Sequence, residues 1–182
     1  PLGRQVMKGI EDEIELAVQA LRKGKVILYP TDTIWGLGCD ATNSKAVERL
    51  FRIKRKKEQG RLIALIDSPA RLSNYLSEVP DLALDLIRYA ANPISIVFPL
   101  GQNLAKNMLG PDGSVCFRVT DDPICIALVE RFNKRVASGS ANLSGQPTPL
   151  FYAAISSEII LAVDHVVKLN QDKMLSTKAT SI

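Results

Sequence analysis

Short apolar runs alternate with segments of helical periodicity along this chain of 182 residues. Apolar residues from Ile10 to Leu21 recur at the spacing of one helix face, and Gly24 follows as a stop signal. The apolar run at 26–29 then predicts a buried strand that ends at Pro30. The same patterns predict strands at 62–66, 94–98, 115–119, 135–137 and 165–169, and helices at 46–53, 69–76, 80–89, 123–132 and 153–162.

One-for-one alternation of strands and helices is typical of an α/β domain in which helices cover a twisted sheet. The strands at 94–98 and 115–119 have no helix between them, so we expect a mixed parallel and antiparallel sheet. The length suits one domain, which we predict over residues 7–182. Residues 1–6 precede Met7 and are interpreted as an extension outside the fold.

The charge is moderately positive and unevenly distributed. A net charge of +4 and a pI of about 9.0 favour anionic partners. Eight lysines and arginines cluster between residues 45 and 61, opposed only by Glu48 and Glu58. The three scattered cysteines suit neither a disulfide framework nor a zinc site, and we interpret them as reduced thiols of a cytoplasmic protein. No apolar run of about 18 residues occurs, so no membrane span is expected.

Two segments about a hundred residues apart carry most of the polar chemistry. P-T-D-T-I-W-G-L-G occupies residues 30–38, S-G-S-A-N-L-S-G-Q-P occupies residues 138–147, and each follows a predicted strand. The first places hydroxyl groups, and the second hydroxyl and amide groups, among glycines, where backbone can approach a ligand closely. Together with a lysine cluster, these are the groups that a triphosphate site needs. Neither segment is a phosphate-binding loop of the G-x-x-x-x-G-K-[ST] type.

Each feature also has a structural interpretation. Thr31 and Thr33 alternate on an extended backbone, so their hydroxyls would share one face, but they also suit a solvated turn that ends a strand. Ser140 and Asn142 share the same spacing, and a plain loop would be unusually rich in such groups. The lysines from Lys54 onward either complement a helix C-terminus, at about 0.3–1 kcal/mol each, or contact phosphate or RNA.

Three single residues invite comparable alternatives. Arg118 lies inside an apolar run, and a buried arginine needs an anionic partner, which is either a structural carboxylate or a substrate carboxylate gripped by the guanidinium fork. Trp35 either packs in the core or stacks on a base. His165 is the only histidine and is interpreted as structural, so hydrolysis by a Ser/His/Asp triad is not expected.

In their order and spacing, these motifs resemble those of the YrdC-like family, the threonylcarbamoyl-AMP synthases that act in tRNA modification. Residues 30–37 look like the family's P-T-[DE]-T-x-[YW]-G-L, residues 140–145 match S-A-N-x-S-G, and Arg118 matches the arginine of an R-V strand. Residues 54–56 stand where the family has K-x-R, with Lys56 in place of the arginine, which keeps the charge but loses the bidentate fork.

The resemblance implies a YrdC-like fold with a basic concave surface. It also implies a nucleotidyltransferase that converts L-threonine, bicarbonate and ATP into threonylcarbamoyl-AMP and pyrophosphate. The threonine amine and bicarbonate form a carbamate without a protein nucleophile, and a carbamate oxygen then attacks the α-phosphorus. Catalysis would consist of positioning and of charge neutralisation by lysines and Mg²⁺. A chain that offers cations and hydroxyls but no convincing acid–base pair fits that chemistry.

The resemblance also implies roles for individual residues. The expected catalytic residues, which contact the phosphates, are Lys54 and Lys56. The expected ATP-binding residues are Lys54, Lys56, Ser114, Ser140 and Asn142. The expected threonine-binding residues are Thr33, Arg118 on the carboxylate, and Ser181, which closes the site. No metal ligand is expected among the side chains.

The expected partners are L-threonine and ATP, double-stranded RNA or tRNA, and the tRNA threonylcarbamoyl-transferase proteins that act downstream. Two alternatives remain open. One is a non-catalytic module that binds double-stranded RNA through salt-dependent phosphate contacts. The other is a nucleotide-binding regulator on the same fold. A preference for threonine over serine rests on one methyl group, worth about 1–3 kcal/mol, and no sequence spacing reveals it.

Overall fold

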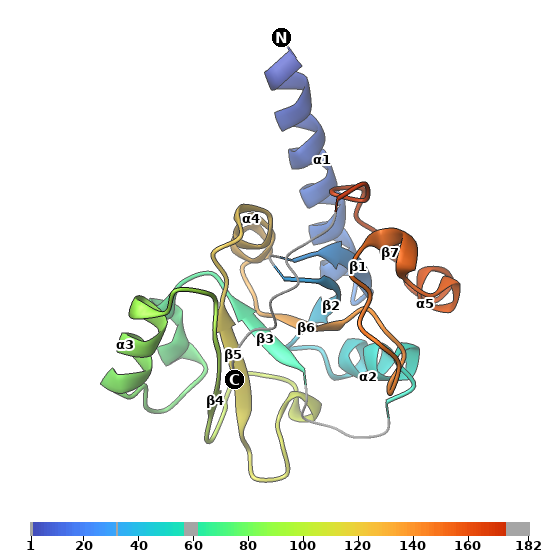
Figure 1. Ribbon diagram of the computed structural model, residues 1–182. Coiled ribbons are helices and arrows are strands. Elements are labelled where there is room, and N and C mark those ends of the chain that lie inside the picture. The colour runs from blue at the N-terminus through green and yellow to red at the C-terminus, as the bar shows by residue number, and fades with distance from the viewer. Residues whose placement is uncertain (1, 32, 57–61, 174–182) are drawn as a thin grey trace.

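The computed structural model describes residues 2–31, 33–56 and 62–173, and within these ranges the strands form one seven-stranded sheet (Figure 1). The strand order is β4-β5-β3-β6-β2-β1-β7. The strands are β1 (Ile27–Pro30), β2 (Trp35–Asp40), β3 (Ile63–Ile66), β4 (Ser95–Phe98), β5 (Val115–Val119), β6 (Val136–Ser140) and β7 (His165–Val166). The helices are α1 (Leu2–Arg22), α2 (Ser44–Ile53), α3 (Asp81–Tyr89), α4 (Pro123–Phe132) and α5 (Ser157–Ala162), with short 3₁₀ turns η1 (Pro69–Asn74), η2 (Lys106–Met108) and η3 (Tyr152–Ala154).

The sheet is mixed, as its sequence pattern predicts. Strands β3 and β5 pair in parallel, as do β1 and β7, and every other neighbouring pair is antiparallel. The antiparallel β4–β5 pair corresponds to the two predicted strands without an intervening helix. The α/β fold class is therefore confirmed.

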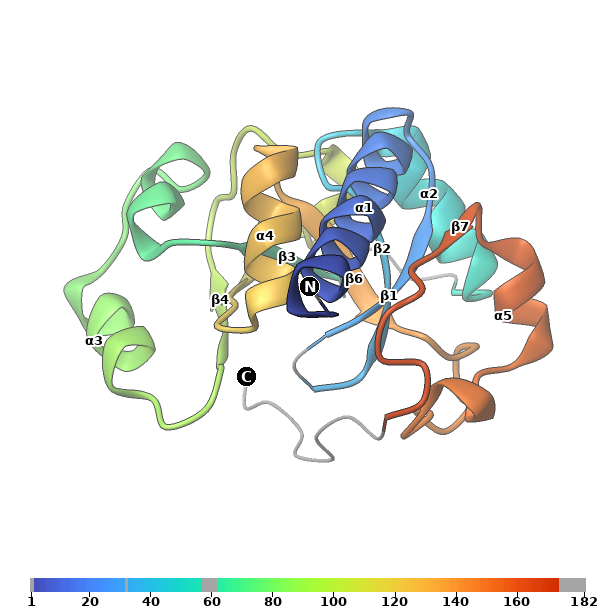
Figure 2. The same ribbon diagram turned by 90° about the horizontal axis from the view of Figure 1, so that it is seen from above.

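Helices cover both faces of the sheet. Helices α1 and α4 lie side by side over one face (Figure 2), where their apolar residues pack with Ile27 and Leu65. Helix α2 packs on the opposite face with Leu37 and Ala64. Ala64 precedes Leu65 on β3, and Leu37 pairs with Leu28, which follows Ile27 on β1, so the two pairs of residues point to opposite faces. Helix α1 is exposed over residues 2–9 and projects beyond the sheet (Figure 1).

The largest local difference from the sequence pattern is strand β2. Residues 30–38 predict a turn that ends a strand, whereas the chain reverses after Pro30 and returns as β2, antiparallel to β1 and buried along its whole length. Gly36 and Gly38 hide this strand from the pattern, because glycine has a low strand propensity and interrupts the alternation of side chains.

Smaller differences concern helix ends. Asn43 caps α2, because its side-chain oxygen accepts from the amides of Lys45 and Ala46. The segment predicted as a helix at 69–76 is the 3₁₀ turn η1, and the side-chain oxygen of Ser68 caps it. The helix predicted at 153–162 is broken, and α5 begins only after Ser156, which serves as its cap.

One apolar stripe of helix α3 faces solvent. Leu82, Leu86 and Tyr89 have helical spacing, yet their exposed fractions are 70%, 50% and 75%. The buried side of α3 is formed by Ala83 with the partly buried Ile87. Two apolar stripes compete on this helix, and spacing alone does not decide which one faces the core.

A buried ion pair joins β6 to the loop after β3. The Nη1 atom of Arg135 donates to Oδ1 of Asp67 over 2.9 Å, and the guanidinium stacks over the ring of Tyr75 at 5.3 Å. Arg135 is 1% exposed. Asp67 also lies 3.4 Å from Nε of Arg71, which is a more exposed partner. Removing one member of such a pair leaves a buried charge without its main compensation.

We therefore expect Arg135→Ala to lower the free energy of unfolding by about 3 kcal/mol. The matched control is Arg131→Ala, which removes a solvent-exposed pair with Glu15 and should change stability by less than about 1 kcal/mol. Denaturant unfolding of both variants measures the difference. Equal losses in the two variants would contradict a structural role for the buried pair.

Candidate functional site

The turn between β1 and β2 is closed by the hydroxyl of Thr31. Its Oγ1 atom accepts from the backbone amides of Thr33 at 3.2 Å and Ile34 at 3.0 Å, and donates to the carbonyl of Ile34. The Thr33 hydroxyl lies 3.3 Å from that of Thr31, and both side chains are buried. The interpretation as a solvated turn is therefore wrong. Thr31 holds the turn, and Thr33 stands beside it.

Lys54 connects the end of α2 to the second polar segment. Its Nζ atom donates to the carbonyl oxygens of Ser140 and, over 2.9 Å, of Asn142. The side-chain oxygens of the same two residues lie farther away, at 3.4 and 3.5 Å. The lysine stem packs along Gly139, where a Cβ would meet Cδ2 of Leu62 at 3.0 Å and Cδ of Lys54 at 3.5 Å. The structure thus brings together three residues predicted to bind ATP: Lys54, Ser140 and Asn142.

The Lys54 ammonium lies in an environment that opposes its charge. Only 5% of the residue is exposed, and among the described residues no carboxylate forms an ion pair with it. Burial, and secondarily the positive charge of the half-buried Lys56, lower its pKa to about 8. Two cations held this close favour a site for an anion, because a bound negative charge would relieve both effects.

The loop that follows β6 is fixed by Asn142. Its amide nitrogen donates to the carbonyls of Leu143 at 3.2 Å and Gln146 at 2.9 Å. Gly145 adopts a left-handed backbone with φ of +84°, a conformation that glycine tolerates best. The amide of Ser144 donates to the Lys54 carbonyl over 2.8 Å. These bonds give the segment one defined conformation beside the lysine.

Arg118 lies on β5 with a partner on the next strand. Its Nε atom donates to Oγ of the buried Ser95 over 3.0 Å, and the two residues are paired in the β4–β5 register. Arg118 is 8% exposed. Half-buried Cys116 lies two residues earlier on the same face, and burial raises its thiol pKa. A buried Arg–Asp pair beside this sheet is formed by Arg135, which the sequence pattern did not single out.

The register places Arg118 and Ser140 on one face of the sheet but not in contact. Ser138 pairs with Ile63, which pairs with Cys116, so these residues form one row across the sheet. Ser140 lies two residues beyond that row in one direction and Arg118 two residues beyond it in the other. The separation is about 13 Å along the strands and about 10 Å across them. The polar residues therefore occupy two ends of an elongated area.

Of the remaining predicted site residues, the structure describes Ser114. Ser114 precedes β5 at the same end of the sheet as Ser140, and its hydroxyl donates to Oδ1 of Asp112 over 2.6 Å, which helps to lower the pKa of that carboxyl. Ser181 lies outside the described residues. Trp35 is fully buried and packs against Tyr152 with ring centroids 5.2 Å apart, so its packing interpretation is confirmed.

Glycines of the first segment provide space rather than unusual backbone angles. Neither Gly36 nor Gly38 has a left-handed φ. Instead, the ring of Tyr29 on β1 lies over them, and its hydroxyl reaches Oγ of Ser138 on β6 at 2.6 Å. A Cβ at Gly38 would lie 2.8 Å from Cε1 of this ring and 3.2 Å from Cγ1 of Val136. Sequence reasoning missed Tyr29 because it reads as the last residue of an apolar strand.

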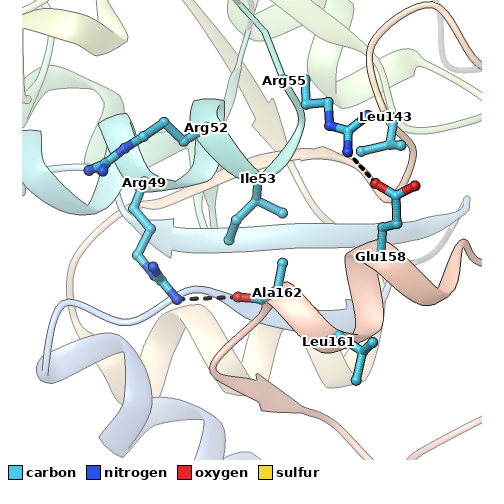
Figure 3. A pocket seen from close by; sticks show the side chains of 8 residues that line it. All are labelled: Arg49, Arg52, Ile53, Arg55, Leu143, Glu158, Leu161 and Ala162. Carbon is cyan, nitrogen blue, oxygen red and sulfur yellow. Dashed lines mark hydrogen bonds and ion pairs between the residues drawn. The ribbon is translucent and has the colours of Figure 1, made fainter.

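The outward side of α2 forms a separate groove. An open hollow of about 580 Å³ lies between α2 and α5 (Figure 3) and is lined by Arg49, Arg52, Ile53, Arg55, Leu143, Glu158, Leu161 and Ala162. Arg49 pairs with Asp164 at 2.7 Å, and Arg55 pairs with Glu158. The basic cluster of the sequence is therefore divided. Lys54 turns inward to the polar segment, while two arginines of the outer side are neutralised by carboxylates.

Among the residues that the structure describes, no group of three or more His, Cys, Asp and Glu side chains could hold a metal ion. None of the helices found there combines the length and apolar character that a membrane crossing requires.

A sequence model of the Sua5/YciO/YrdC family, described as telomere recombination, matches residues 19–182. The chain belongs to this family. A curated relative from Pseudoalteromonas translucida, named threonylcarbamoyl-AMP synthase, is 36% identical over 160 residues, which is 86% of each chain. This relative carries the name of an enzyme.

Solved structures of the family share the fold. Pyrococcus abyssi Sua5, determined in complex with L-threonine, superposes with a TM-score of 0.80 at 27% identity and covers 90% of this chain. The present chain spans about half of that longer protein, 47% of its length. Escherichia coli YciO gives a TM-score of 0.74 at 27% identity, over 84% of this chain and 75% of its own.

The packing of Tyr29 predicts the effect of a small substitution. Gly38→Ala should lower the free energy of unfolding by about 1–3 kcal/mol, because the added methyl group meets the Tyr29 ring in a filled core. The matched control is Gly9→Ala in α1, where nothing lies within 4 Å and the helix should gain about 0.5–1 kcal/mol. Denaturant titration compares the two. A Gly38→Ala variant as stable as the wild type would contradict the contact.

The lowered pKa of Lys54 predicts that the free energy of unfolding depends on pH. An unfolded lysine has a pKa near 10.5, and in the folded protein the pKa is about 8, so the unfolded chain binds more protons between these values. The contribution of Lys54 to the free energy of unfolding is therefore constant below about pH 8 and rises from there towards pH 10.5. Comparing denaturant titrations from pH 7 to 9.5 for wild type and Lys54→Met isolates this contribution. We expect a smaller rise in the variant, and parallel curves would contradict it. Lys45→Met, at an exposed position, is the control.

Proposed function

We propose that this protein is a threonylcarbamoyl-AMP synthase, a nucleotidyltransferase that forms threonylcarbamoyl-AMP and pyrophosphate from L-threonine, bicarbonate and ATP. The product would serve the threonylcarbamoyladenosine modification of tRNA. Family membership, the name of the Pseudoalteromonas relative and the threonine complex of Pyrococcus Sua5 support the proposal. The observation that carries it is the buried Lys54 ammonium at the S-A-N segment, close to the second cation, Lys56.

The nucleotide would lie at the Lys54 end of the site. An ammonium group has three donors, and two of them go to the carbonyls of Ser140 and Asn142. The third has only long contacts at 3.4 and 3.5 Å, so a phosphate oxygen can replace them at low cost. Lys56 would add a second positive charge, and Ser114 would complete the site from the start of β5.

The amino acid would lie at the Arg118 end. The bond from Nε of Arg118 to Ser95 fixes the plane of the guanidinium, whose terminal nitrogens suit a carboxylate. The register places the β1–β2 turn at the Ser140 end of the sheet, so Thr33 would contribute from that side, and Ser181 would close the site. These two roles are proposals that follow from the family motifs.

The chemistry needs orientation more than acid–base groups. The carbamate forms when the threonine nitrogen bonds to the carbon of bicarbonate, with loss of water. A carbamate oxygen then bonds to the α-phosphorus, and the bond from that phosphorus to the pyrophosphate oxygen breaks. The lysines would stabilise charge on the phosphoryl oxygens and on the leaving group. Mg²⁺ would arrive with the triphosphate and neutralise part of its charge, since it is usually held by substrate phosphates and one or two carboxylates.

The proposed biological setting includes tRNA or other double-stranded RNA, the downstream tRNA threonylcarbamoyl-transferase proteins and a cytoplasmic location. An RNA-binding role without catalysis is less well supported. Only 5% of Lys54 is exposed, which favours the phosphates of a small ligand that enters the site over the backbone of a duplex, and Arg49 and Arg55 are engaged by carboxylates on their own surface.

Release of pyrophosphate from ATP in bicarbonate buffer tests the function. We expect release that depends on L-threonine, with serine and no amino acid as parallel reactions. Release independent of the amino acid, or none at all, would contradict a synthase. A salt-dependent shift of duplex RNA without pyrophosphate release would support the RNA-binding alternative instead.

The same assay tests Lys54. Lys54→Ala should lower turnover by about 10²–10³-fold, because a preorganised positive charge at the phosphates is lost. Lys54→Met keeps the apolar stem in its packed position and should show the same loss, which separates charge from packing. Arg52→Ala, an exposed basic residue on the same helix, should retain wild-type turnover. A near-normal rate in both Lys54 variants would remove this lysine from the mechanism.

A further inference from the structure

A tyrosine on β1 reaches across a neighbouring strand to the candidate site. Tyr29 pairs with Gly36 of β2, and β2 lies between β1 and β6. The two outer strands are about 10 Å apart, which is two strand spacings. The phenol oxygen nevertheless lies 2.6 Å from Oγ of Ser138, the first polar residue of the second segment. Both side chains are buried.

This reach depends on the glycines of the first segment. A Cβ at Gly36 would lie 3.3 Å from both Cε1 of Tyr29 and Oγ of Ser138, and a Cβ at Gly38 would lie 2.8 Å from the same Cε1. A side chain at Gly38 would force the ring to move, and one at Gly36 would press on both the ring and the Ser138 hydroxyl. The first segment is therefore shaped to let one tyrosine cross it.

Ser138 lies between the two ends of the proposed site. Ser140 is two residues farther along β6, towards Lys54, and Arg118 lies in the other direction on the same sheet face. A ligand with phosphates at the lysine and a carboxylate at the arginine would place its central groups near Ser138. In the proposed reaction, those groups are the carbamate and the α-phosphate, where the new bond forms.

We propose that Tyr29 is a positioning residue that orients the Ser138 hydroxyl towards the reacting carbamate and α-phosphate oxygens. This inference rests on the proposed function. In this arrangement Tyr29, the stronger acid of the two hydroxyls 2.6 Å apart, is the donor and Ser138 the acceptor. The Ser138 hydroxyl then donates its own proton to a substrate oxygen that becomes more negative during the reaction. Tyr29 itself does not contact the substrate.

The Tyr29→Phe variant tests the proposal, because phenylalanine keeps the ring over the glycines and removes only the hydroxyl. We expect kcat to fall about tenfold, with KM for ATP and threonine changed less than twofold. Ser138→Ala should give a loss of at least that size, and the double variant should be no slower than Ser138→Ala. Tyr89→Phe, at an exposed position on α3, is the matched control and should behave as the wild type.

Two results would overturn the proposal. One is an unchanged kcat in Tyr29→Phe, and the other is losses that multiply in the double variant, because Tyr29 would then not act through Ser138. Denaturant unfolding of each variant separates these outcomes from a loss of folded protein.

Binding of a non-hydrolysable sulfamoyl analogue of the threonylcarbamoyl adenylate, measured by calorimetry, separates this proposal from the synthase assignment. Wild type that binds the analogue but releases no pyrophosphate would contradict the synthase activity. In that case, an affinity for the analogue about tenfold weaker in Tyr29→Phe than in the wild type would still support the positioning role of Tyr29. Equal affinities of the two proteins for the analogue would contradict that role. A wild type without pyrophosphate release or analogue binding would contradict both proposals.

Discussion

Lys54 places an ammonium group where burial opposes its charge, and the contacts that compensate for this define the candidate site. Its donors go to backbone carbonyls of the S-A-N segment, so the lysine and that segment fix each other's position. The arrangement joins the end of α2 to the end of β6, two elements far apart in sequence. A site built this way is positioned by secondary structure, and an arriving anion meets a charge that is already in place.

The sequence predicts those helices and strands whose caps and apolar patterns match the way they pack in the folded protein. Helix α4 begins where Asp122 and Pro123 indicate, because the carboxylate caps the amide of Cys125. Strand β5 follows its apolar run. Strand β2 is not predicted because its two glycines are there to make room for the Tyr29 ring on the neighbouring strand. That contact leaves no signal in the sequence of β2 itself.

The same distinction applies to the site residues. Lys54, Ser140 and Asn142 could be predicted as neighbours because their motifs carry hydroxyl, amide and ammonium groups beside predicted strand and helix ends. The contact of the Lys54 ammonium with main-chain carbonyls could not be predicted, since every residue has a carbonyl. Arg118 attracts notice because it interrupts an apolar run. Arg135 precedes a strand and looks like a surface residue, yet it forms the buried pair with Asp67, which only the tertiary fold creates.

The pairing of Arg49 with Asp164 and of Arg55 with Glu158 affects how the protein meets ligands from solution. Paired charges cancel beyond a few ångströms, so these arginines add little to the long-range potential that speeds the approach of a nucleotide. Their contribution is mechanical, as they tie α2 to α5 and to the start of β7. The attraction that an incoming polyanion feels is thus weaker than the number of basic residues suggests, and its rate of association should vary only gently with ionic strength.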